Sequence, residues 1–114
     1  MLRAFTVDVS TDLVVVRFSE FADQERTPEE EKLLVKLVLL HQLVVFDLTG
    51  CRCCGVTWIR MITALTIDAN RINHRVAIVG ADEELKASAD YIGHKNWFHF
   101  FDSLDEAKRW ANVT

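Results

Sequence analysis

Two kinds of hydrophobic pattern alternate along the chain, and each predicts a different element. Continuous or alternating apolar runs are typical of β-strands, whereas apolar residues spaced three or four apart are typical of helices. The first pattern predicts five strands: Leu2–Val9, Leu13–Phe18, Leu43–Phe46, Arg75–Val79 and Trp97–Phe101. The second, together with start and stop signals, predicts four helices: Thr27 to about His41, Gly55 to Ile72, Asp82–Ile92 and Ser103–Trp110.

Capping signals mark two of the helix starts. Thr27 precedes a proline, and Glu30 stands where the third helical residue would be, which is the pattern of a capping box with proline in the first turn. Ser103 and Glu106 have the same spacing. Both sites therefore predict a helix that begins at a defined residue.

The order of the elements predicts the fold class. The polar turn Ser10–Asp12 is too short for a crossover, so the first two strands form an antiparallel hairpin. The later strands alternate with helices of about 10 to 18 residues, which implies parallel pairing with right-handed crossovers. We predict one α/β domain over residues 1–114, with a mixed, mostly parallel sheet and the order β-β-α-β-α-β-α-β-α.

Composition narrows the classes of function. The chain has 114 residues, half of them apolar and 26% charged, which excludes wholesale disorder. Its 13 basic and 17 acidic residues give a net charge of −4. No basic stripe is present to neutralise phosphates, so the sequence predicts no nucleic-acid partner.

Three features predict a cytoplasmic protein. Met1–Ser10 lacks the apolar core of a signal peptide. The apolar stretch Leu37–Phe46 is interrupted by His41 and Gln42 and is too short to insert in a membrane. An odd, closely spaced set of cysteines favours reduced thiols over a disulfide framework. These cysteines are Cys51, Cys53 and Cys54.

Three segments, in their order and spacing, resemble the STAS domain. Leu43–Gly50 resembles the central strand of that family, Val76–Gly80 the following strand, and Phe101–Ala107 the closing strand-to-helix signature. The family includes bacterial anti-sigma factor antagonists and the cytoplasmic tails of sulfate transporters. The resemblance implies a bacterial, non-catalytic signalling module without cofactors, whose partner is an anti-sigma-like kinase or another regulatory protein.

One segment departs from the family pattern. Antagonists carry Asp-Ser-Ser-Gly before the second long helix, and a kinase phosphorylates the first serine. This chain has Arg52, Cys53, Cys54 and Gly55 there, and its loop is about three residues shorter by comparison with the family. The resemblance therefore implies a module without the usual serine phosphoswitch, in which Thr57 carries the nearest substitute hydroxyl.

The resemblance also implies a partner-binding surface. It consists of the start of the second long helix and a loop aspartate: Asp23, Arg52, Cys53, Cys54, Gly55 and Thr57. A helix N-terminus beside Arg52 would favour a thiolate or a bound anion. The alternative is that the cysteines are packing residues, as free cysteines often are, and that Asp23 is a solvated loop carboxylate.

Catalytic and metal-binding patterns are missing from the sequence. It has neither a glycine-rich phosphate loop nor a Gly-x-Ser-x-Gly elbow. Cys51 and Cys53 are one residue apart, unlike the two-residue gap of zinc knuckles. The histidines fall at the ends of different predicted elements: His41, His74, His94 and His99. We expect no enzyme activity, no metal and no cofactor.

Two other functions remain open. Glu106–Trp110 is similar to the final helix of STAS/SEC14-like proteins, which implies a small-molecule or lipid-binding module. The cysteine cluster, taken alone, supports a thiol-based redox protein.

The first predicted helix is more apolar than a one-sided helix requires. Over Leu33–Leu40 only Lys36 is polar, and Trp97–Phe101 is similarly rich in aromatic residues. Either segment is a candidate homodimer interface, and burial in the core is the alternative. Aspartate substitutions at Val38 and Leu39 would separate the two explanations.

Overall fold

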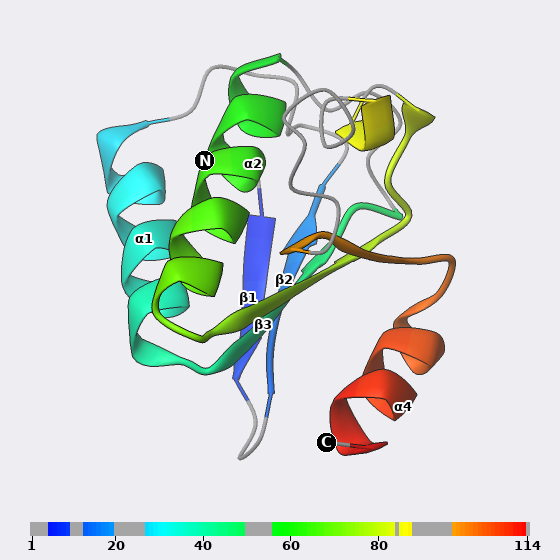
Figure 1. Cartoon of the computed structure of the whole chain (residues 1–114). Helices are drawn as coiled ribbons and strands as arrows, with labels where there is room; N and C mark the ends of the chain where they lie inside the picture. The colour runs from blue at the N-terminus through cyan, green and yellow to red at the C-terminus, as the bar shows by residue number, and fades with distance from the viewer. Residues whose placement is uncertain are drawn as a thin grey trace.

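A five-stranded sheet forms the centre of the fold in the computed structural model (Figure 1). The strands lie side by side in chain order: β1 (Phe5–Val9), β2 (Val14–Phe18), β3 (Leu43–Asp47), β4 (Arg75–Val79) and β5 (His99–Phe101). Three helices have defined bounds: α1 (Pro28–Leu40), α2 (Val56–Arg71) and α4 (Leu104–Val113). The structure describes residues 5–9, 13–19, 27–49, 56–83, 85–87 and 97–113, and within these Glu83 and residues 85–87 are also helical.

Strand pairing confirms the predicted mixed sheet. β1 is antiparallel to β2, with Val7 opposite Val16, whereas β2, β3, β4 and β5 pair in parallel. The chain passes through α1 between β2 and β3 and through α2 between β3 and β4. Such helical crossovers are what parallel neighbours require. The predicted order β-β-α-β-α-β-α-β-α is confirmed.

β3 lies in the middle of the sheet, and its sequence explains why. Leu43, Val44, Val45 and Phe46 are all buried, although their side chains alternate between the two faces. A strand with neighbours on both sides and cover on both faces accepts apolar residues at consecutive positions. The continuous apolar run therefore belongs at the centre.

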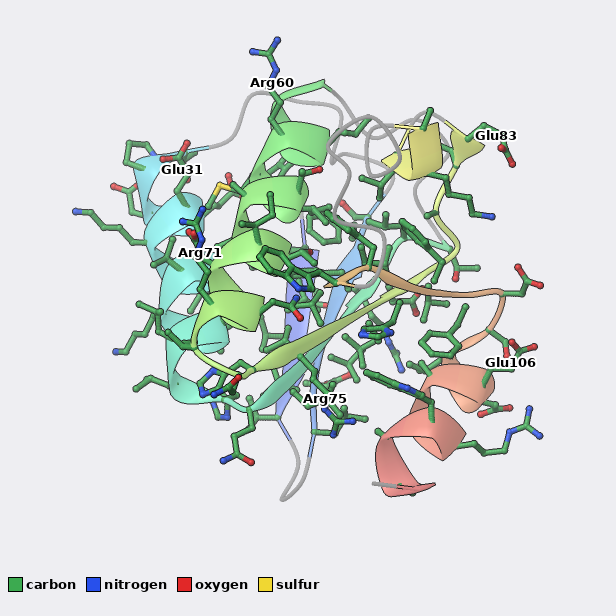
Figure 2. The ribbon with its side chains drawn as sticks, viewed as in Figure 1. Glu31, Arg60, Arg71, Arg75, Glu83 and Glu106 are labelled. Carbon is green, nitrogen blue, oxygen red and sulfur yellow. The ribbon has the colours of Figure 1, made fainter. Side chains whose placement is uncertain are left out.

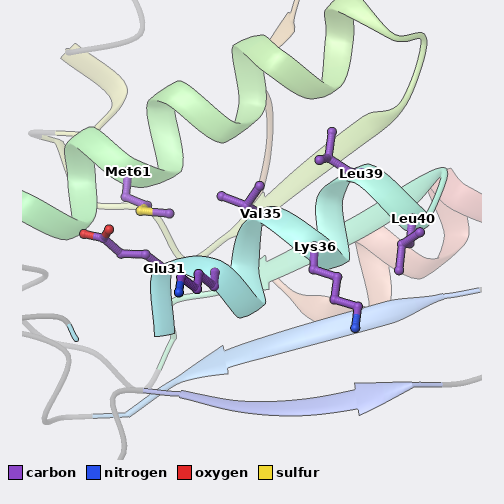
Figure 3. Close-up of a pocket in the computed structure, with 7 residues that line it drawn as sticks. Glu31, Val35, Lys36, Leu39, Leu40 and Met61 are labelled. Atoms are coloured by element: carbon purple, nitrogen blue, oxygen red, sulfur yellow. The ribbon is translucent and has the colours of Figure 1, made fainter. Parts of the chain in front are cut away.

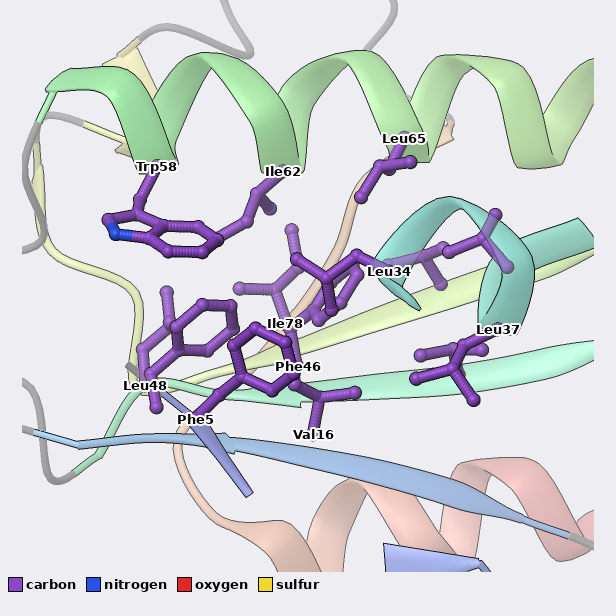
Figure 4. Packing of buried hydrophobic residues seen from close by; sticks show 14 of the residues in the cluster. Phe5, Val16, Leu34, Leu37, Phe46, Leu48, Trp58, Ile62, Leu65 and Ile78 are labelled. Atoms are coloured by element: carbon purple, nitrogen blue, oxygen red, sulfur yellow. The ribbon is translucent and has the colours of Figure 1, made fainter. Parts of the chain in front are cut away.

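Helices cover both faces of the sheet (Figure 1). α1 and α2 pack on one face, where the side chains of Trp58, Ile62 and Leu65 point from α2 towards the strands (Figure 4). α4 packs on the other face, over a smaller buried cluster. That cluster consists of Val15, Val45, Ala77, Val79 and Ala107.

The predicted capping box at Thr27 is present. Thr27 Oγ1 accepts a hydrogen bond from the Glu30 N–H at 3.2 Å, and Glu30 Oε1 accepts one from the Thr27 N–H at 2.9 Å. The helix ends at Leu40, because the backbone becomes extended at His41. Local sequence therefore determines where α1 begins.

The predicted last strand and last helix differ from the structure. The strand begins at His99 and not at Trp97, because the Trp97 carbonyl accepts a hydrogen bond from Asn70 Nδ2 of α2 at 3.1 Å. That carbonyl is therefore directed at a helix and not at the neighbouring strand. The last helix continues past Trp110 to Val113, since no helix-breaking residue follows. The start of the predicted strand Leu2–Val9 and the end of the predicted helix Asp82–Ile92 lie outside the described residues. The remaining ends differ from the predicted ones by at most one residue.

Across the described residues, no helix combines the length and the apolar character needed to cross a membrane. The two longest with defined bounds, α1 and α2, have 13 and 16 residues. A span needs roughly 20.

Candidate functional site

The carboxyl ends of four strands lie at one edge of the sheet. Because β2, β3, β4 and β5 are parallel, the chain leaves each of them at this edge. In open α/β sheets, ligands bind outside the carboxyl ends of the strands. The chain leaves β3 through Thr49, leaves β4 through Gly80 and enters α2 at Val56. This edge is the candidate functional site.

Asp47, the last residue of β3, shapes the turn at the end of that strand. Its Oδ1 accepts a hydrogen bond from the Thr49 N–H at 3.0 Å, as aspartate side chains often do in turns. The next residue, Leu48, is buried, and its N–H donates to the Val79 carbonyl at 2.8 Å. The end of β3 is therefore joined to the end of β4.

Gly80 brings β4 close to the turn that follows β3. Its φ is +71°, in the left-handed region that glycine adopts at no steric cost. Its N–H donates to the Phe101 carbonyl at 3.0 Å, which joins β4 to β5. A Cβ at this position would lie 3.0 Å from Thr49 Cα, Thr49 N and Thr49 Oγ1. The absence of a side chain therefore permits this close approach.

We expect Gly80→Ala to lower the free energy of unfolding by about 1–3 kcal/mol. Alanine would carry the strained φ, and its Cβ would press on two backbone atoms of Thr49 that are unable to rotate away. Urea unfolding followed by circular dichroism measures the loss. Thr49→Ala is the control, since it removes only the Oγ1 contact. Full recovery of stability in the double variant would contradict the backbone argument.

Trp58 packs the beginning of α2 against the sheet. Its side chain is fully buried and lies edge-on to two aromatic rings, with centroids 5.9 Å from Phe5 on β1 and 5.4 Å from Phe18 on β2. The first N–H groups of a helix have no partners within the helix and, with the helix dipole, favour an anion. The packing of Trp58 therefore determines the position of this end of α2 relative to the sheet.

Of the sequence-predicted site residues, the structure describes only the backbone of Thr57. Asp23, Arg52, Cys53, Cys54 and Gly55 are outside the described residues. Thr57 lies in the first turn of α2, and its side chain is outside the description. In the sequence, Arg52–Gly55 belongs to the segment 50–55, which joins Thr49 after β3 to Val56 at the start of α2.

The structure also shows three residues that the sequence analysis did not assign to the site. Gly80 follows an apolar strand, which is a recognisable turn signal. Trp58 resembles any other residue on the apolar face of a helix. Nothing in the sequence relates Thr49 to Gly80, because their contact depends on the pairing of β3 with β4.

Two carboxylates near this edge, Asp47 and Asp82, accept hydrogen bonds from backbone N–H groups. Asp82 Oδ1 accepts a hydrogen bond from the Leu85 N–H at 2.9 Å, as a helix-capping residue does. Asp47 closes the turn after β3. Within the described ranges, no group of three or more His, Cys, Asp or Glu side chains is placed to hold a metal ion.

A second polar cluster lies on the α4 side of the sheet. The His99 ring lies 4.7 Å from the Trp110 ring, and the Arg75 guanidinium lies over the same indole at 4.8 Å. Burial lowers the pKa of His99 from its usual 6.5, and the positive charge of Arg75 lowers it further. Its imidazole is therefore harder to protonate in the folded protein than in the unfolded chain.

Stability should consequently fall as the pH drops below about 6.5. The unfolded chain takes up a proton on this imidazole at a higher pH than the folded protein does, so the contribution of His99 is present above 6.5 and is lost during acidification. Urea midpoints measured from pH 7.5 to pH 5 test this. His99→Gln should show a shallower slope, whatever its stability at pH 7.5. Equal slopes would show that another group controls the change.

A family model and several solved structures match this chain. The model describes the STAS domain and matches residues 4–107. An anti-sigma factor antagonist from Mycobacterium paratuberculosis has a TM-score of 0.72 and 16% identity, covering 95% of this chain and 92% of that chain. The phosphorylated form of the Bacillus cell-fate determinant SpoIIAA has a TM-score of 0.69 and 10% identity, covering 93% and 98%. Its unphosphorylated form has a TM-score of 0.72 and 9% identity, covering 92% and 94%. Comparison with the sequences of curated proteins finds no match.

Proposed function

Because this chain belongs to the STAS domain family, we propose that it is a regulatory module that binds a partner protein and performs no catalysis of its own. The observation that carries the proposal is the ordered edge at the carboxyl ends of β3 and β4. There, Asp47 closes a turn, Thr49 packs on Gly80, and Trp58 fastens the start of α2. These contacts hold both ends of the intervening segment, as a binding surface requires.

The partner surface consists of that segment, the first turn of α2 and one loop aspartate. It includes Asp23, Arg52, Cys53, Cys54, Gly55 and Thr57. A guanidinium and the first N–H groups of a helix both favour an anion, so the group complementary to Arg52 and the start of α2 is a carboxylate or phosphate. A regulatory protein, such as an anti-sigma-like kinase, is the partner class that we propose.

This module works without a serine phosphoswitch. SpoIIAA, which has a similar fold, has been solved in phosphorylated and unphosphorylated forms. The present chain has Cys53 and Cys54 where the family pattern has serines, so no hydroxyl is available there. Phosphopeptide mapping from native cells should find this segment unmodified. Phosphate on Thr57 would restore a phosphoswitch and overturn this part of the proposal.

Site-specific crosslinking tests the partner surface. A photoreactive amino acid at position 52 should give one discrete crosslinked species in native cells. The same group at the exposed Lys108 position on α4 is the control and should give none. Arg52→Glu, with the photoreactive group moved to position 57, should abolish the crosslink, because it opposes an anionic partner group. A crosslink only at position 108 would contradict the proposal.

The alternative of a lipid-binding module receives less support. Its signature, Glu106–Trp110, is accounted for by packing of α4, in which Ala107 is fully buried and Trp110 contacts His99 and Phe101. Native mass spectrometry of the purified protein would reveal a retained lipid.

The alternative of a thiol-based redox protein is tested by the rates at which the cysteines are alkylated. We expect the three cysteines to react slowly until the protein unfolds, whereas fast labelling slowed by Arg52→Ala would favour a reactive thiol.

A further inference from the structure

α1 exposes apolar side chains to an unusual extent. The described residues include six large apolar side chains that are exposed, and four of them lie on this helix. They are Leu33 (40% exposed), Val35 (39%), Leu39 (51%) and Leu40 (65%). The opposite side of the helix buries Leu34, Leu37 and Val38 against the sheet. α1 therefore carries apolar residues on both sides, which packing among the described residues does not explain.

The exposed side of α1 lines a shallow groove beside α2 (Figure 3). Its volume is about 490 Å³. Its apolar lining comes from Val35, Leu39 and Leu40 of α1 and from Met61 of α2. A methionine in a groove adapts to differently shaped apolar partners. The shape suits an amphipathic helix laid along α1.

The charges in the α1 groove are opposite to those of the chain as a whole. Lys32 and Lys36 lie one helical turn apart, and Glu31 is the third charged residue of the lining. Two lysines and one glutamate give the lining a net charge of +1, whereas the chain carries −4. The exposed Arg60 of α2, which lies outside this lining, points away from α1 (Figure 2). The groove therefore combines an apolar floor with a locally cationic rim.

This charge distribution distinguishes between two possible occupants of the α1 groove, a second copy of the chain and an acidic helix of another protein. A second copy of the chain would form a two-fold contact, in which the same surface meets itself. That arrangement brings a lining with a net charge of +1 towards a second lining of the same charge, and like charges repel. An acidic helix would instead place carboxylates beside both lysines. The homodimer that the sequence suggested for this face is therefore the less favourable occupant.

We propose that the α1 groove binds an amphipathic helix of a partner protein, with an apolar stripe flanked by aspartate or glutamate. Apolar residues at positions i, i+3, i+4 and i+7 of that helix would contact Val35, Leu39 and Met61. Its flanking carboxylates would pair with Lys32 and Lys36. Other variants test this proposal than test the partner surface at Arg52–Thr57, so the two binding proposals succeed or fail independently.

A pair of synthetic peptides tests the inference. Each is about 18 residues long, long enough to be helical in water, with leucines at i, i+3, i+4 and i+7. One carries glutamates on both sides of the leucine stripe, and the other carries lysines at the same positions. Fluorescence anisotropy with the whole chain should show binding of the acidic peptide with a dissociation constant of about 100 µM or tighter. The basic peptide should bind at least about tenfold more weakly.

Variants of the chain locate the binding. Leu39→Asp should weaken binding of the acidic peptide about tenfold or more, because it places a carboxylate in the apolar floor of the groove. The double variant Lys32→Glu/Lys36→Glu should reverse the preference between the two peptides. Val9→Asp is the matched control, since Val9 is 62% exposed on β1 and does not line the groove. Circular dichroism verifies that each variant is folded.

Three results would overturn the inference. Equal affinity for both peptides, or no effect of Leu39→Asp, would show that the groove does not select an acidic helix. A dimer mass by light scattering that Leu39→Asp reduces to a monomer mass would assign the face to a second copy. Binding to vesicles of anionic phospholipid, lost in the same variant, would assign it to a membrane surface.

Discussion

Trp58→Ala is expected to lower the free energy of unfolding by about 3–5 kcal/mol. Trp58 is fully buried and is the largest of the completely buried side chains. It packs edge-on against Phe5 (Figure 4) and against Phe18, and the centroids of these two phenylalanine rings are 5.7 Å apart. Removing the indole opens a cavity that rigid aromatic neighbours fill poorly, so both the burial and the ring contacts are lost.

This loss is large compared with the total stability of a small domain, which is about 5–15 kcal/mol. Urea unfolding followed by far-ultraviolet circular dichroism measures it. Trp110→Ala is the matched control, because Trp110 is only partly buried and packs on the opposite face. Trp110→Ala should lower the free energy of unfolding by less than half as much as Trp58→Ala. Equal losses would show that Trp58 has no special role in fastening α2.

The second large effect concerns two adjacent residues of α1. Val38→Asp should cost more than about 4 kcal/mol, because Val38 is 1% exposed and its replacement would bury a carboxylate in the apolar core. Leu39→Asp should stay within about 1 kcal/mol of the original chain, because Leu39 is 51% exposed. Both substitutions place an acid in the last turn, so their interaction with the helix dipole is similar.

Thermal and urea unfolding distinguish the two variants. Val38→Asp should be expressed poorly and lack a cooperative transition, whereas Leu39→Asp should unfold cooperatively near the original midpoint. Val38→Asn serves as a check on charge, since it keeps the shape of aspartate and remains neutral. If Leu39→Asp were as damaging as Val38→Asp, the exposed side of α1 would be part of a core, and the binding inference for the groove would lose its basis.

The sequence alone determined the elements whose signals are local. The capping box of Thr27 and Glu30 is satisfied by residues three positions apart, so no other part of the chain is needed to begin α1. The apolar run Leu43–Phe46 indicated the central strand, because a strand covered on both faces accepts apolar residues at consecutive positions. The order of strands and helices then sufficed to predict the mixed sheet.

Only the tertiary structure decided which surfaces meet. The start of β5 depends on a hydrogen bond from Asn70 to Trp97, residues that lie far apart in the sequence. The approach of Gly80 to Thr49 likewise follows from the pairing of β3 with β4. Periodicity also left α1 ambiguous, because its apolar residues fall on more than one side of the helix. Contact with the sheet is what buries one side and leaves Leu39 exposed, since only the relative placement of distant segments determines which atoms lose their water.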